Sequence, residues 1–226
     1  MLKGIFLDLD GTLINSEKAF SDCFIDVLNN KYNANVTSAD YKKYELEQNA
    51  MLIAHVRQTT NLLNSVLDEE IMSIVYNNYL NYFKKIIQEE EALTSFELLR
   101  ELKKKGFVLS LVTTCRRCYL DILDAEQRIY ELFKCVIARE DVKKLKPDEE
   151  AYLQALEIVG IKPEDSLAIE DSKRGIDAAL RANIPTIKVD NYTEIKYHDP
   201  RVIEEESANK VLRKVLNNGN YKWKLY

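Results

Sequence analysis

Residues 12–105 contain neither glycine nor proline, and this feature limits what the chain can fold into more than any other. Both residue types interrupt helices, so a stretch of this length without them is typical of helical structure. Polar segments near residues 29–40, 59–65 and 89–95 divide the stretch. The sequence therefore predicts about four consecutive helices here.

The rest of the chain shows a different pattern, in which short apolar runs alternate with helical segments. Such runs predict strands buried on both faces of a sheet, and they occupy residues 4–9, 107–112, 135–138, 167–169 and 186–189. Further helices are expected at residues 96–105, 150–159 and 175–182. This alternation predicts an α/β fold with a doubly wound, Rossmann-like parallel sheet. We expect the α/β core to comprise residues 1–15 and 92–226, and an α-helical insert to comprise residues 16–91.

Composition excludes several classes of protein. The chain has 32 basic and 37 acidic residues, a net charge of −5, so we expect no nucleic-acid partner. No apolar run approaches the ~20 residues of a membrane helix, and the N-terminal pattern is not that of a signal peptide. We therefore expect a cytoplasmic protein with no membrane partner. Four cysteines and two histidines cannot build a disulfide scaffold or a histidine-rich metal site.

Two carboxylates, Asp8 and Asp10, follow the first predicted strand. In an open α/β sheet, ligands bind beyond the carboxyl ends of the strands. Side chains at i and i+2 of an extended segment share one side, and burying two carboxylates there is costly unless a cation or proton offsets them. Gly11 lets the chain turn away with its backbone close to a ligand. A solvated strand end with a turn is the simpler alternative.

Polar residues also follow the second predicted strand and precede a helix. Thr113 and Thr114 offer a hydroxyl and backbone amides that can hold phosphate oxygens, although threonine at a strand end is also common as a helix cap. Lys146 directly precedes Pro147, which fixes the start of the next helix. This lysine could neutralise a phosphate or a nucleophile, or it could belong to a surface basic cluster.

A second acidic pair, Glu170 and Asp171, ends the fourth predicted strand. The small residues that follow, beginning with Gly175, allow close packing of helix and sheet. Oxygen ligands from Asp8, Asp171 and the main-chain carbonyl of Asp10 would suit Mg²⁺, which binds alongside substrate phosphate.

Together these segments resemble the four motifs of the haloacid dehalogenase-like hydrolase superfamily, in order and with sensible spacing. The matching residues are Asp8-Leu9-Asp10-Gly11-Thr12, Thr113, Lys146-Pro147, and Glu170-Asp171-Ser172 with Gly175. The resemblance covers essentially the whole core, and the chain is similar to the phosphoglycolate phosphatase/β-phosphoglucomutase-like branch, whose helical cap the insert resembles. It implies a Mg²⁺-dependent phosphatase acting on a small phosphorylated metabolite, as a monomer or a homodimer.

The resemblance also implies a role for each motif residue. Asp8 would be the nucleophile that forms an aspartyl phosphate, and Asp10 would protonate the leaving oxygen and then activate water. Lys146 would offset the charge of the transferring phosphoryl group. The implied phosphate-binding residues are Asp8, Leu9, Asp10, Thr113, Thr114 and Lys146. The implied Mg²⁺ ligands are Asp8, Asp10 through its main-chain carbonyl, Asp171, and Glu170 either directly or through water.

Two alternatives to the phosphatase stay open. A β-phosphoglucomutase-like sugar-phosphate mutase would use the same aspartyl phosphate. The resemblance to that group implies a cap histidine at the position of Phe20 and a cap loop that contains glycine. The insert has no glycine. A non-catalytic binding protein would retain the fold, yet no motif residue is missing.

Several other side chains attract attention without a motif. Cys115 and Cys118 have the spacing of a redox pair, but they lie beside the second motif and lack the second pair a zinc site needs. Candidates for substrate selection, each explained better as a solvated or packed side chain, are Lys42, Lys43, Gln48, His55, Arg57, Arg116 and Arg117.

Overall fold

The computed structural model describes residues 2–44, 49–190 and 196–218, and divides into two compact units. One unit combines Met1–Asn15 with Ile87–Tyr226, and the other is Ser16–Ile86. The first carries the sheet and the second is helical. No described helix is long and apolar enough to cross a membrane.

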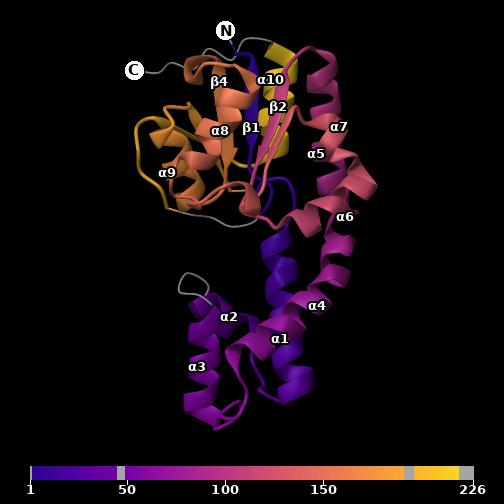
Figure 1. Cartoon of the computed structure of the whole chain (residues 1–226), viewed down its shortest axis with the longest axis vertical. Helices are drawn as coiled ribbons and strands as arrows, with labels where there is room; N and C mark the ends of the chain where they lie inside the picture. Colours follow the sequence, from indigo (N-terminus) through magenta and orange to yellow (C-terminus); the bar gives the residue numbers. More distant parts are fainter. Residues whose placement is uncertain (1, 45–48, 191–195, 219–226) are drawn as a thin grey trace. The chain divides into compact units, whose positions relative to one another are not determined.

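The α/β unit is built on a six-stranded sheet in which all neighbouring strands are parallel (Figure 1). The strand order is β3-β2-β1-β4-β5-β6. The strands are β1 (Gly4–Leu7), β2 (Val108–Val112), β3 (Cys135–Ile137), β4 (Ser166–Glu170), β5 (Thr186–Val189) and β6 (Val202–Glu205). Strand β1 is central because the chain runs outward from it in both directions, and β1, β2 and β4 are buried almost throughout. The predicted doubly wound parallel sheet with a helical insert is confirmed.

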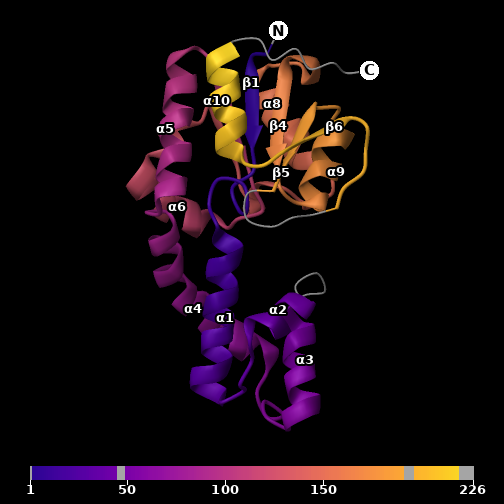
Figure 2. The same cartoon turned by 180° about the vertical axis from the view of Figure 1, so that it is seen from behind.

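Helices cover both faces of this sheet. Helices α8 (Glu150–Val159) and α9 (Lys173–Arg181) lie over the face seen in Figure 1, and α5 (Glu90–Lys104) and α10 (Ala208–Asn218) over the face seen in Figure 2. Between β2 and β3 the chain forms α6 (Arg117–Gln127) and the short α7 (Ile129–Leu132). The core under α8 and α9 is rich in alanine, which lets these helices approach the strands closely.

The helical unit contains α1 (Ser16–Tyr32), α2 (Ser38–Tyr44), α3 (Asn49–Thr60) and α4 (Asp68–Ile86). A capping box starts α2, because the amide of Thr37 donates to Asp40 Oδ2 at 2.9 Å and the amide of Asp40 donates back to Thr37 Oγ1 at 3.2 Å. Helix α4 has three acidic residues in its first turn and two lysines in its last, which complements the helix dipole. Helices α1 and α4 pack side by side through buried apolar residues of both.

Some predicted boundaries were wrong. The helix expected from residue 96 begins at Glu90, because Glu90 and Glu91 form its first turn rather than a polar break, and Ala92 and Ser95 are buried. The helix expected from Gly175 begins at Lys173, with Ser172 accepting from the Gly175 amide as its N-cap. Strand β6 and helices α6, α7 and α10 were not predicted.

Candidate active site

The central strands bring most of the predicted site residues to one edge of the sheet. Asp8 directly follows β1, Thr113 directly follows β2, and Glu170 is the last residue of β4, with Asp171 next. Because β1 pairs in parallel with both β2 and β4, these ends meet at the carboxyl edge. Asp8, Glu170 and Asp171 each offer an oxygen within 4.8 Å of those of the other two, and all three residues are buried.

Lys146 lies among these carboxylates although it comes from the loop before α8. Its side chain is 4% exposed, and Nζ donates to Asp8 Oδ1 at 2.6 Å, to Glu170 Oε1 at 2.6 Å and to the carbonyl of Val112 at 2.7 Å. Burial alone would lower the pKa of the Lys146 ammonium, but the charges of Asp8 and Glu170 outweigh it and raise this pKa above its usual value. Arg174 holds the Lys146 backbone, donating to its carbonyl from Nε at 2.9 Å and from Nη2 at 2.6 Å. The lysine is therefore a charged bridge between two strand ends.

Burial raises the pKa of both carboxylates that Lys146 joins. For Asp8 the lysine and the backbone amides of Leu9 and Asp10 act in the opposite direction without cancelling this effect. For Glu170 burial raises the pKa to about 7, against the lowering effect of Lys146. The buried cluster thus contains three carboxylates. Among the described residues, Lys146 is the one cation that forms ion pairs with them. Such an excess of negative charge favours binding of a cation or a proton.

The donor set of this cluster fits a hard divalent cation such as Mg²⁺, which prefers oxygen ligands. Glu170 Oε2 is buried and has no hydrogen-bond partner within the described part of the chain, so it is an oxygen available to a ligand. Asp171 is oriented by Thr12, whose hydroxyl donates to Oδ1 at 3.0 Å. The residues that could hold the metal are therefore Asp8, Glu170 and Asp171.

Two glycines make room for the acidic side chains. A Cβ on Gly11, which has φ +79°, would stand 2.0 Å from Asp171 Oδ2. A Cβ on Gly175 would stand 1.9 Å from Glu170 Oε2. Both distances are far below any van der Waals contact, so the positions of these carboxylates depend on glycine.

The other predicted residues lie around the cluster rather than within it. Asp10 is partly exposed, and its carboxylate is not one of the three clustered acids. Thr113 Oγ1 donates to Asp10 Oδ2 at 3.5 Å and accepts from the amide of Cys115 at 3.0 Å. The side chain of Leu9 is fully buried, which leaves its backbone for ligand binding, and Thr114 is exposed.

Sequence reasoning missed Tyr152, whose hydroxyl donates to Glu170 Oε1 at 2.5 Å, and Arg174. The apolar spacing of residues 150–159 places Tyr152 in the core like any other buried aromatic, and nothing in the sequence shows where its hydroxyl points. Arg174 is an exposed helical arginine whose partner is a main-chain oxygen, which no side-chain pattern reveals.

The candidates for substrate selection have mixed outcomes. Arg57 has a local structural role, because its guanidinium donates to the carbonyls of Leu63 and Val66 and pairs with Asp68. Arg117 pairs with Asp141. Gln48 and the side chains of Lys42 and Lys43 lie outside the described residues.

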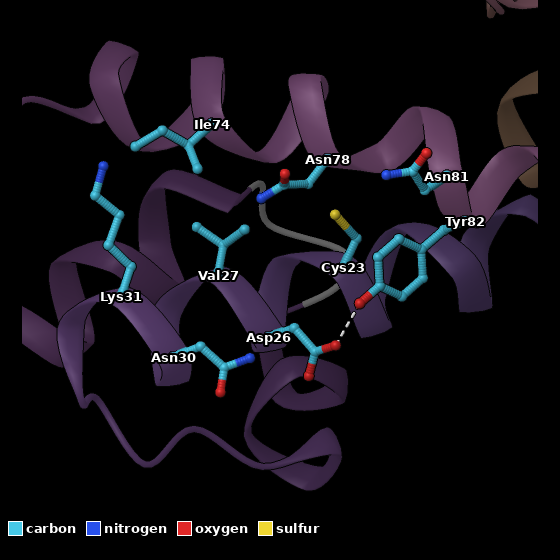
Figure 3. Close-up of a pocket in the computed structure, with 9 residues that line it drawn as sticks. All are labelled: Cys23, Asp26, Val27, Asn30, Lys31, Ile74, Asn78, Asn81 and Tyr82. Carbon is cyan, nitrogen blue, oxygen red and sulfur yellow. Dashed lines mark hydrogen bonds between the residues drawn. The ribbon is translucent and has the colours of Figure 1, made fainter.

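The helical unit has a pocket of its own between α1 and α4, with a volume of about 500 Å³ (Figure 3). Cys23, Val27 and Ile74 are among its lining residues, and Tyr82 donates a hydrogen bond to Asp26 at its side. This bond and burial raise the pKa of Tyr82 to about 12. None of the predicted site residues lines this pocket.

The sheet order and the buried acid–lysine cluster at its carboxyl edge define a Rossmann-like enzyme with a site suited to a divalent cation. A family model described as haloacid dehalogenase-like hydrolase matches residues 5–189. This chain belongs to that family, as its motifs predicted, and it is a hydrolase.

Relatives in sequence and structure agree with this assignment. The chain is 27% identical over 185 residues to the pyrophosphatase PpaX of Bacillus mycoides (strain KBAB4), and the aligned region covers 82% of each chain. It is 28% identical to PpaX of Bacillus cereus (strain G9842), with the same coverage. Its fold is that of CbbY from Rhodobacter sphaeroides in complex with phosphate (TM-score 0.73, 21% identity, 93% of this chain and 96% of that one). It is also that of β-phosphoglucomutase from Clostridium difficile (TM-score 0.65, 18% identity, 96% and 98%).

Proposed function

We propose that this chain is a Mg²⁺-dependent phosphatase that hydrolyses a small phosphorylated metabolite through an aspartyl phosphate on Asp8. The observation that carries the proposal is the bridge from Lys146 to Asp8 and Glu170, within a buried cluster that also contains Asp171. This arrangement combines an anionic nucleophile, a fixed positive charge and an acidic metal site at one point of the sheet. Phosphoryl transfer needs all three, because its catalysis depends on positioning and charge neutralisation.

Asp8 is the nucleophile in this proposal. Lys146 holds Oδ1, so we assign Oδ2 to the attack on phosphorus. The backbone amides of Leu9 and Asp10 act on the Asp8 carboxylate and are therefore close enough to bind the transferring phosphoryl group. The bond that forms joins Asp8 to phosphorus, and the bond that breaks joins phosphorus to the leaving oxygen.

Asp10 is the general acid and base. Its partly exposed carboxylate is next to the hydroxyl of Thr113, which we assign to phosphate binding together with the Thr114 amide. Asp10 gives its proton to the leaving oxygen, then takes a proton from the water that hydrolyses the aspartyl phosphate. Inorganic phosphate leaves and Asp8 is regenerated.

Mg²⁺, when bound by Asp8, Glu170 and Asp171, supplies positive charge that offsets the repulsion between the nucleophile and the phosphate oxygens. Asp171 is held for this role by Thr12, and Glu170 presents Oε2. We assign a fourth ligand to the main-chain carbonyl of Asp10.

We assign catalysis to the α/β unit and substrate selection to the helical unit, Ser16–Ile86. Phe20 supports a phosphatase over a mutase. It packs against Phe24, Tyr76 and Tyr79, with ring centroids 5.4 to 6.3 Å apart, and thus belongs to an aromatic cluster rather than to proton transfer. The PpaX relatives add pyrophosphate to the substrates worth testing.

The test is phosphate release from a panel of phosphate monoesters and pyrophosphate, with Mg²⁺ or with chelator. We expect Mg²⁺-dependent release that Asp8→Asn abolishes. Asp165→Asn is the matched control, because Asp165 pairs with Lys3 just before β4 begins, at the opposite edge of the sheet. Release that persists in Asp8→Asn would refute the nucleophile. Isomerisation of a hexose phosphate with an added bisphosphate, without phosphate release, would establish the mutase.

A further inference from the structure

The two oxygens of the Glu170 carboxylate have different surroundings. Oε1 accepts hydrogen bonds from Lys146 Nζ at 2.6 Å and from the Tyr152 hydroxyl at 2.5 Å. Oε2 is buried with no hydrogen-bond partner among the described residues, and it lies beside the Cα of Gly175. The carboxylate is therefore held from one side and open to a ligand on the other.

Tyr152 touches both partners of this ion pair. Tyr152 lies on α8 and is fully buried in the core between this helix and the sheet. The ammonium of Lys146 lies 5.3 Å from the centroid of its ring. Burial and the charge of Glu170 raise the pKa of the Tyr152 hydroxyl well above its usual value, so the hydroxyl keeps its proton and donates it. Packing alone would place a phenylalanine equally well here, and the hydroxyl is the part of the side chain that contacts Glu170.

We propose that Tyr152 is a positioning residue that fixes which oxygen of Glu170 is available to the metal. The last torsion of a glutamate side chain is soft, and a single hydrogen bond from the Lys146 ammonium would leave the carboxylate able to rotate. The second bond, from a rigid ring, commits Oε1 to the protein and leaves Oε2 for the cation or for a water bound to it. The inference rests on the proposed metal-dependent function and adds to it a residue outside the four motifs.

Tyr152→Phe tests the hydroxyl alone. The phenylalanine retains the ring, the core packing and the contact with the ammonium, and removes only the donor to Oε1. Tyr79→Phe is the matched control, because Tyr79 is also buried and also loses one hydroxyl bond, to the carbonyl of Ser16 in the helical unit. Thermal unfolding of both variants without metal checks that each is folded.

The measurement is Mn²⁺ binding, followed by the electron paramagnetic resonance signal of free Mn²⁺, in the whole chain without substrate. We expect Tyr152→Phe to weaken Mn²⁺ binding about tenfold, the lower end of the range for residues that orient metal ligands, and Tyr79→Phe to leave it unchanged. The KM for p-nitrophenyl phosphate should change less than kcat, because the hydroxyl does not contact substrate.

Equal Mn²⁺ affinity in Tyr152→Phe and the unmodified protein would overturn the proposal, and so would a protein that binds no Mn²⁺. Failure of the proposed function has a different signature. In that case the unmodified protein releases no phosphate from any ester, while the tenfold difference in Mn²⁺ affinity persists and still supports the role of Tyr152.

Discussion

Gly175 lies in the first turn of α9, where its Cα faces the carboxylate of Glu170. A Cβ at this position would stand 1.9 Å from Oε2 and 2.2 Å from the carboxyl carbon. Real Cβ atoms essentially never approach another heavy atom within 3.0 Å, so in Gly175→Ala the carboxylate must retreat by about 1.1 Å. The substitution therefore moves a proposed metal ligand without changing any charged group.

The expected size of the effect follows from this displacement. A misplacement of about 1 Å in a reacting site costs about 100-fold in rate, equivalent to about 2.7 kcal/mol. Stability should fall by no more than about 2 kcal/mol, because alanine favours a helix over glycine by about 1 kcal/mol. Strain in the bonds from Glu170 to Lys146 and Tyr152 opposes this gain by about 1–3 kcal/mol. We expect a folded protein whose kcat is about 100-fold lower.

The assay is Mg²⁺-dependent phosphate release, with thermal unfolding measured in parallel. Gly160→Ala is the matched control, because Gly160 has φ +67° at the end of α8 and no described heavy atom lies within 4 Å of its would-be Cβ. This control should lose about 1–2 kcal/mol of stability from its left-handed backbone and keep its turnover. If Gly175→Ala retains more than half of the original kcat while folded, the steric reasoning is refuted.

Two further predictions concern charge in the same cluster. Lys146→Met leaves Asp8 and Glu170 buried without their shared cation, so urea unfolding at pH 8 in chelator should show a loss of about 3–5 kcal/mol; unfolding at the same urea concentration as the original protein would contradict this. Glu170 has a pKa of about 7 in the folded chain against 4.5 as its ordinary value. Because the folded chain binds this proton more tightly than the unfolded chain, protonated Glu170 stabilises the fold at pH values below 4.5. This stabilisation is lost as the pH rises through about 7. The melting temperature of the metal-free protein, relative to Glu170→Gln, should therefore fall from pH 5 to pH 8, and a rise would show that the carboxylate is not destabilised by burial.

The elements with a regular apolar pattern bounded by turn residues were predictable from the sequence. The segment Thr186–Val189 forms β5 with the expected bounds, and Glu150–Val159 forms α8 likewise. In both cases apolar periodicity and turn residues agree, so local preference and tertiary packing require the same structure. Three of the four motif segments were predictable for a related reason, because their polar side chains directly follow or end buried strands, whereas Lys146 lies in the loop before α8.

Most of the elements that the sequence did not predict lack one of these signals. Strand β6 is an edge strand with no fully buried residue, so it has no apolar run from which a strand could be predicted. Helix α10 is different, because its buried positions 208, 211, 212, 215 and 216 have a clear helical period. The start of α5 is ambiguous in the sequence, because an acidic run can be either a solvated loop or the first turn of a helix, and only the burial of Ala92 and Ser95 distinguishes the two.

The candidate site departs from the rules that govern the rest of the chain, and its departures share one explanation. Three carboxylates are buried around Lys146, one of their oxygens lacks a hydrogen bond among the described residues, and the space for them depends on Gly11 and Gly175. Each of these features is unfavourable for a fold selected for stability alone. A divalent cation removes the cost of the first two, since it neutralises the excess charge and occupies the open oxygen. The stability gained on adding Mg²⁺ should therefore be smaller in Glu170→Gln, because that change lowers the excess negative charge of the cluster from two to one and removes the open carboxylate oxygen.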